Sequence, residues 1–216
     1  MKYLFIFIFL LLCVRTSKTQ ETLTDRYCDS TNAIIRGDDY LGIYNTQTIN
    51  LERNVRAIGP QKTRITIYYV QPEDSIYDDG KTVEFIPRFN VPFKIKSEYN
   101  ISASQFVTAE YFLDAKGNLI LYRYITQGLY TCELEKYYFN INELTRLEKQ
   151  VSDSCITPEG TILDNIPQSF EKYKPQVREN SFTKDDRENA NEILDNVKEY
   201  LEIYYDLFDI EQLDKD

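Results

Sequence analysis

The stretch QFVTAEYFLDAKGNLILYRYITQGLYTCELEKYYFNINELTRL, residues 105–147, decides the fold of this chain. It contains two successive units, each with a run of β-branched and aromatic residues, a short polar turn and a second run. In the first turn, Asp114 suits the start of a type I turn and Gly117 suits a position with positive φ. In the second turn, Asn140 and Asn142 stand in similar places, and asparagine also tolerates the left-handed region. The pattern predicts two consecutive β-hairpins.

The flanking residues predict further strands and a helix at either end. Residues 23–35 combine apolar side chains with a threonine cap and predict a helix. Strands are expected within 40–55 and over 64–70, 82–86 and 94–99, with Gly59 and Pro60 forming a turn. Residues 152–176 show no sustained helical or strand periodicity and are expected to form a long irregular connection.

A second helix is expected near the C-terminus, over residues 183–208. Thr183 precedes Asp186 by three positions, which resembles a capping box, and apolar residues then recur at steps of three and four. The expected fold class is therefore α+β. An antiparallel β-meander of about five to seven strands lies between an N-terminal and a C-terminal helix.

The paired hairpin pattern resembles a family of uncharacterised secreted proteins from Bacteroidetes-type bacteria. The residues that carry this resemblance are EYFLDAKGNLI at 110–120 and EKYYFN at 135–140. The resemblance implies two tandem tyrosine-rich hairpins between N- and C-terminal helices, and a location outside the cytoplasm. It implies no catalytic residue.

The first 20 residues have the features of a secretory signal peptide. Lys2 is followed by an apolar run over residues 3–14 and a polar exit over 15–20, and this run is too short to span a bilayer. Cys13 raises the alternative of a lipoprotein, which is disfavoured because Leu12 stands where a small residue is needed. We expect residues 21–216 to form a single domain that is secreted or periplasmic and has no membrane span.

The charge of the chain argues against nucleic acid as a partner. The formal net charge is −10, and removal of Lys2, Arg15 and Lys18 with the leader changes it to −13. An acidic protein with scattered basic residues repels phosphate backbones and anionic lipid surfaces.

Three cysteines remain after residue 20: Cys28, Cys132 and Cys155. Because export leads to an oxidising compartment, a disulfide is expected, and Cys132 with Cys155 is the preferred pair since the two flank the second hairpin. The alternative is that all three are small buried apolar residues.

The composition excludes several classes of enzyme. The chain has no histidine, so it lacks the usual proton shuttle, zinc ligand and base of a nucleophilic triad, and it has no glycine-rich phosphate loop. Its acidic pairs lack the ligand spacing of a calcium loop. We expect no cofactor and no metal. A carboxylate-dependent hydrolase of glycan-type substrates stays an alternative, with Glu84, Glu110, Glu133 and Glu135 as candidates.

The excess of tyrosine, 18 residues in all, is the remaining feature. Tyrosine buries a large ring and keeps its hydroxyl wet, so it suits a half-exposed sheet or a binding surface. A binding surface is expected on the sheet face away from the C-terminal helix, at Tyr111, Tyr122, Tyr124, Tyr137 and Tyr138. We expect an exported, non-enzymatic protein that binds a protein or peptide partner through this face or an open edge strand. An inhibitor or immunity-type protein is a further alternative.

Overall fold

A computed structural model describes residues 23–35, 44–55, 59–69, 77–78, 81–82, 92–102, 105–128, 131–152, 170 and 173–208. The chain divides into two units, residues 1–42 and 43–216. In the first unit, residues 23–35 form the expected helix, in which the Thr31 hydroxyl donates a hydrogen bond to the carbonyl oxygen of Tyr27 at 2.9 Å. The signal peptide lies outside the described residues, so the leader and the extent of the mature domain stay predictions.

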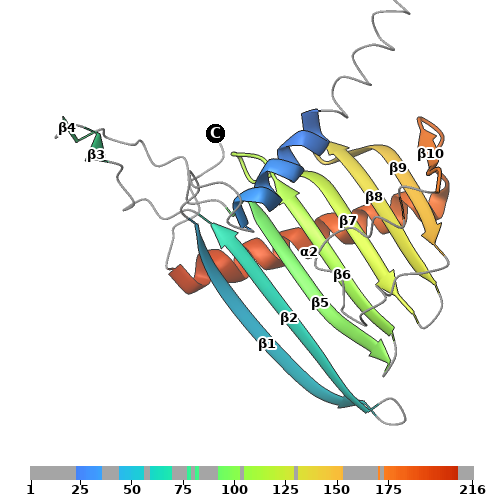
Figure 1. The fold of residues 1–216 in the computed structure, drawn as a ribbon, viewed down its shortest axis with the longest axis horizontal. Coiled ribbons are helices and arrows are strands. Elements are labelled where there is room, and N and C mark those ends of the chain that lie inside the picture. Colours follow the sequence, from blue (N-terminus) through green and yellow to red (C-terminus); the bar gives the residue numbers. More distant parts are fainter. Residues whose placement is uncertain are drawn as a thin grey trace, which may run out of the picture. The chain divides into compact units, whose positions relative to one another are not determined.

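The second unit is built on an eight-stranded antiparallel sheet in the order β1-β2-β5-β6-β7-β8-β9-β10 (Figure 1). Its strands are β1 (Asn45–Val55), β2 (Gly59–Tyr69), β5 (Lys94–Ser102), β6 (Gln105–Leu113), β7 (Leu119–Gln127), β8 (Cys132–Asn140), β9 (Glu143–Ser152) and β10 (Gln176–Glu179). A separate two-stranded sheet consists of β3 (Tyr77–Asp78) and β4 (Lys81–Thr82). The α+β class and the antiparallel meander are thus confirmed.

Two expectations about the strands are wrong. The sheet has more strands than the expected number of about five to seven. The additional strand β10 begins at Gln176, the last residue of the expected irregular connection, and its four exposed side chains show no apolar alternation that could have revealed it. Gly59 and Pro60 do not form a turn, because they pair with Val55 and Asn54 at the start of β2.

Both hairpins of residues 105–147 are confirmed. In the β6–β7 turn, Gly117 has a φ of 81°, and one carboxylate oxygen of Asp114 accepts the backbone N–H groups of Lys116 and Asn118, each at 2.8 Å. In the β8–β9 turn, Ile141 and Asn142 have φ values of 48° and 64°. This turn therefore places two consecutive residues in the left-handed region, and only one of them is an asparagine.

The helix α2 (Lys184–Phe208) covers one face of the sheet, and Figure 1 shows it crossing the strands. Cross-strand register places one row of large apolar side chains on this face, in the order Ile67, Ile95, Tyr111, Tyr122, Tyr137, Leu147. The apolar stripe of α2, which includes Ala190, Ile193, Val197 and Tyr204, packs in the same core cluster. Burial of these two apolar surfaces holds helix and sheet together.

The opposite face of the sheet is charged near its centre. Cross-strand register also places five charged residues in one row across five strands: Lys96, Glu110, Arg123, Lys136 and Glu148. Because successive strand residues point to opposite faces, this charged row and the apolar row alternate along each strand. Among the described helices, none is long and apolar enough to cross a membrane.

Candidate functional site

A pocket of about 360 Å³ lies where α2 passes over the central strands β5 to β8. Its lining contains six tyrosines: Tyr99, Tyr111, Tyr122, Tyr124, Tyr137 and Tyr200. The space exists because two residues with small side chains, Ser97 and Ala109, pair across β5 and β6. They lie in the same cross-strand row as Tyr124 and Glu135. We call this site the tyrosine pocket.

The rings and hydroxyls of the tyrosine pocket form one connected network. The Tyr111 ring contacts the rings of Tyr122 and Tyr200, with centroids 4.9 and 5.5 Å apart, and its hydroxyl is hydrogen-bonded to both residues. The hydroxyls of Tyr99 and Tyr124 are hydrogen-bonded to each other. These bonds hold the rings of three strands and α2 in fixed relative positions.

The hydroxyl groups of Tyr99, Tyr111, Tyr122 and Tyr137 stay uncharged at neutral pH. Burial raises the pKa of Tyr99, Tyr111, Tyr122 and Tyr137 well above the ordinary tyrosine value, and neighbouring hydroxyls or Glu135 raise it further. The charge inside the pocket therefore comes from its carboxylates.

Two carboxylates line the pocket, Glu135 from β8 and Glu192 from α2, and no basic side chain does. Glu135 accepts hydrogen bonds from the Tyr137 hydroxyl at 2.8 Å and from Lys149 Nζ at 2.6 Å. Glu192 is exposed and forms no ion pair with any residue that the structure describes. The pocket thus offers aromatic rings and one unpaired negative charge, a combination that attracts cations.

No known family matches this chain. No curated protein and no solved structure matches it either. The resemblance to secreted Bacteroidetes-type proteins therefore stays a prediction.

The expected location of the tyrosine surface is wrong for four of its five residues. Tyr111, Tyr122, Tyr124 and Tyr137 lie on the face that α2 covers, and three of them are only 3%, 8% and 2% exposed, Tyr124 being half-buried. Tyr138 points to the other face, where the guanidinium of Arg146 lies 5.6 Å from its ring centroid. Rings of this size bury more apolar area against the helix than polar positions do, which explains why α2 packs on the tyrosine face.

The structure also adds residues that the sequence reasoning missed. Tyr99 of β5 and Glu192, Asn196 and Tyr200 of α2 line the pocket with the expected tyrosines. Tyr200 is one of the apolar residues that recur at steps of three and four in the expected helix, a pattern that predicts a core position. Its contact with Tyr111 could be found only with the helix docked on the sheet.

The described candidate carboxylates of a hydrolase do not all lie on one face of the sheet. Glu110 lies on the charged face, whereas Glu133 and Glu135 lie on the face of α2. Burial alone would raise the pKa of Glu110, but Arg123 and Lys94 lower it to about 2, so this residue is ionised and unsuited to act as a general acid. Glu84 lies outside the described residues. Within the described parts of the chain, no three His, Cys, Asp or Glu side chains gather as a metal site needs.

The structure describes two of the three cysteines that follow residue 20. Cys132 is fully buried at the start of β8 and is disulfide-bonded. The thiol of Cys28 is buried in helix 23–35. Cys155 lies outside the described residues, so its pairing with Cys132 stays a prediction.

Proposed function

We propose that the mature chain is an exported, non-enzymatic protein that binds a protein or peptide partner, and that the partner inserts a basic side chain into the tyrosine pocket. One observation supports this most directly. The pocket lining combines six tyrosines with two carboxylates and contains no lysine or arginine.

Physical chemistry favours a lysine or arginine side chain as the occupant. A cation over an aromatic face gains about 0.5–2 kcal/mol, and the gain is larger where water is excluded. Glu192 offers a charge partner at the pocket rim. The net charge of −13 expected for the mature chain also raises the association rate of a basic partner.

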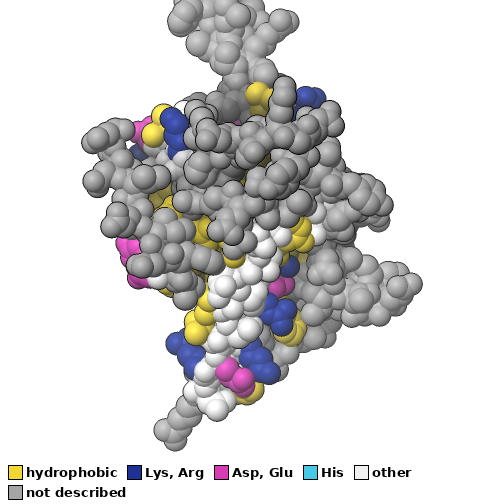
Figure 2. Space-filling model, turned by 90° about the vertical axis from the view of Figure 1, so that its left-hand side faces the viewer, with side chains coloured by type: hydrophobic (Ala, Val, Ile, Leu, Met, Phe, Trp, Pro, Cys, Tyr) yellow, Lys and Arg dark blue, Asp and Glu magenta, His cyan; other side chains and the backbone are white. Residues whose placement is uncertain are grey.

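The edge strand β1 is a less suitable binding surface. Its outer edge pairs with no described strand, so a partner strand could add there. Figure 2 shows this side of the molecule, with mainly backbone and uncharged polar side chains in white and with charged side chains of both signs toward one end. Charged residues such as Glu52 and Arg53 are a common device that blocks pairing at open edges.

The proposal is tested by titrating the mature protein with two peptides of equal length, one rich in lysine and one rich in glutamate. Because the chain has no tryptophan, its intrinsic fluorescence comes from its 18 tyrosines, six of which line the pocket. We expect saturable quenching by the basic peptide alone. Glu192→Gln should weaken this binding about two- to fivefold, the effect of one solvent-accessible ion pair.

Glu199→Gln is the matched control, because it makes the same charge change at an exposed position of α2 outside the pocket. Equal binding of both peptides, or equal weakening by the two variants, would rule out the tyrosine pocket as the site. Turnover of a glycan or peptide by the wild-type protein would instead establish the hydrolase alternative.

A further inference from the structure

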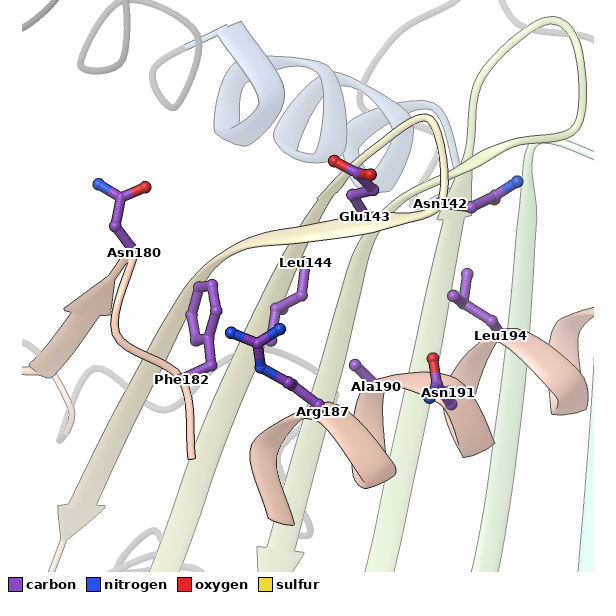
Figure 3. A pocket seen from close by; sticks show the side chains of 9 residues that line it. All are labelled: Asn142, Glu143, Leu144, Asn180, Phe182, Arg187, Ala190, Asn191 and Leu194. Atoms are coloured by element: carbon purple, nitrogen blue, oxygen red, sulfur yellow. The ribbon is translucent and has the colours of Figure 1, made fainter. Parts of the chain in front are cut away.

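A second pocket, of about 480 Å³, lies on the other flank of α2. Figure 3 shows its side chains coming from the β8–β9 turn and the start of β9, from the segment between β10 and α2, and from the first half of α2. The lining residues are Asn142, Glu143, Leu144, Asn180, Phe182, Arg187, Ala190, Asn191 and Leu194. We call this site the asparagine pocket.

Four polar side chains of the asparagine pocket do not interact with polar groups elsewhere in the described residues. The side chains of Asn142, Asn180, Asn191 and Arg187 make no hydrogen bond or ion pair there. This sets Arg187 apart from other basic residues near the start of α2. Arg178 pairs with Asp186 at 2.6 Å and Lys184 with Glu188 at 3.2 Å.

The floor of the asparagine pocket is apolar. Leu144, Phe182 and Leu194 are half-buried and pack against the main core, and Ala190 between them is buried. The core therefore supports the floor, and it includes one aromatic ring. An apolar floor with a few polar groups around it is the usual build of a small-ligand site.

The chemistry of the rim selects the type of ligand. Each asparagine amide offers both donors and an acceptor, Arg187 offers donors, and Glu143 offers acceptors. The single positive and single negative charge cancel, so the rim does not favour an ion of either sign. Mixed donors and acceptors match hydroxyl groups, and the Phe182 ring matches the apolar face of a sugar ring.

We propose that the asparagine pocket binds a neutral saccharide. This site is separate from the tyrosine pocket. At about 100° of rotation per helical residue, Arg187, Asn191 and Leu194 lie on one flank of α2, and Glu192 and Asn196 lie on the other. The inference therefore stands whether or not a basic partner binds at the tyrosine pocket.

The test is a titration of the ¹⁵N-labelled mature protein followed by NMR. The neutral probes are glucose, N-acetylglucosamine, cellotriose and chitotriose at millimolar concentration, and the anionic probes are acetate and glucuronate. We expect at least one neutral probe to shift the side-chain amide signals of Asn142, Asn180 and Asn191 and the Arg187 Nε–H signal, in a saturable way.

Matched variants locate the binding. Arg187→Ala should weaken the neutral saccharide at least about tenfold, because hydrogen bonds from a charged donor are among the stronger ones. Asn191→Ala should weaken it as well, whereas Asn196→Ala, the same change on the opposite flank, should leave it unchanged. The proposal is overturned if no neutral probe shifts these signals, if only the anionic probes do, or if binding survives Arg187→Ala.

Discussion

At the scale of single residues, Glu110 is the centre of a buried charge cluster. Its two carboxylate oxygens accept hydrogen bonds from Lys94 Nζ and Arg123 Nε, both at 2.6 Å, and all three side chains are at most 8% exposed. The Phe112 ring lies under both cations, with Lys94 Nζ 4.9 Å from its centroid. One carboxylate thus compensates two buried positive charges.

Replacing Glu110 should destabilise the fold in a pH-dependent way. Its pKa is about 2 in the folded protein, below the ordinary value of 4.5. Stability from this group is therefore fully present above pH 4.5 and is lost as the pH falls from 4.5 towards 2. We expect Glu110→Gln to lower the free energy of unfolding by about 3–5 kcal/mol at neutral pH, the usual cost of breaking a buried ion pair.

Urea denaturation at neutral pH and at pH values across this acidic window checks the prediction. The variant should lose less stability than the wild type on acidification. Glu133→Gln, at an exposed position of β8, is the control and should behave like the wild type. If Glu110→Gln and the wild type lose the same stability between neutral and acidic pH, the low pKa of Glu110 is wrong.

At the scale of elements, the start of α2 is fixed by a capping box that also connects to β10. The backbone N–H of Asp186 donates to the Thr183 hydroxyl at 3.1 Å, and the N–H of Thr183 donates to the Asp186 carboxylate at 2.9 Å. Arg178 of β10 donates to the same carboxylate oxygen at 2.6 Å. Burial opposes ionisation of Asp186, but these hydrogen bonds lower its pKa, so the carboxylate is available as a cap.

Thr183→Ala should remove one half of this capping box and lower the free energy of unfolding by about 1 kcal/mol. Thr183→Ser keeps the hydroxyl and should retain most of that stability. Chemical denaturation monitored by far-ultraviolet circular dichroism measures both. Equal stability of the alanine and serine variants would show that the Thr183 hydroxyl does not cap α2.

At the scale of the whole molecule, the disulfide of Cys132 limits the unfolded chain. Pairing with Cys155 would close a loop around the second hairpin, and the chain-entropy model gives about 3 kcal/mol for a loop of this size. Cys28 retains its thiol and is therefore not the partner. Cys155 is the candidate that remains after removal of the leader.

We therefore expect the unfolded mature protein to show one reactive thiol. Cys28→Ala should abolish this thiol, and Cys155→Ser should raise the count to two and lower the free energy of unfolding by about 3 kcal/mol. Thiol titration under denaturing conditions and peptide mapping without reduction give both results. Three reactive thiols in the oxidised wild type would exclude the disulfide.

Local patterns in the sequence were sufficient for most elements of the fold. Asp114 and Gly117 defined the first hairpin turn, Thr183 and Asp186 the start of α2, and three- and four-residue steps its apolar stripe. Each of these signals lies within a few residues, where backbone hydrogen bonding and side-chain periodicity act directly. The short strand β10 has no such signal, because its exposed side chains pair only through the backbone.

The sequence by itself determined the α+β class, the two hairpins, the two helices and the absence of histidine chemistry. Local patterns along the strands could not say which face of the sheet α2 covers. That choice depends on the apolar area buried between residues far apart in the chain, such as Tyr111 and Tyr200. Only the tertiary structure could therefore turn an expected exposed tyrosine surface into a pocket beside α2, and place Glu192 in it.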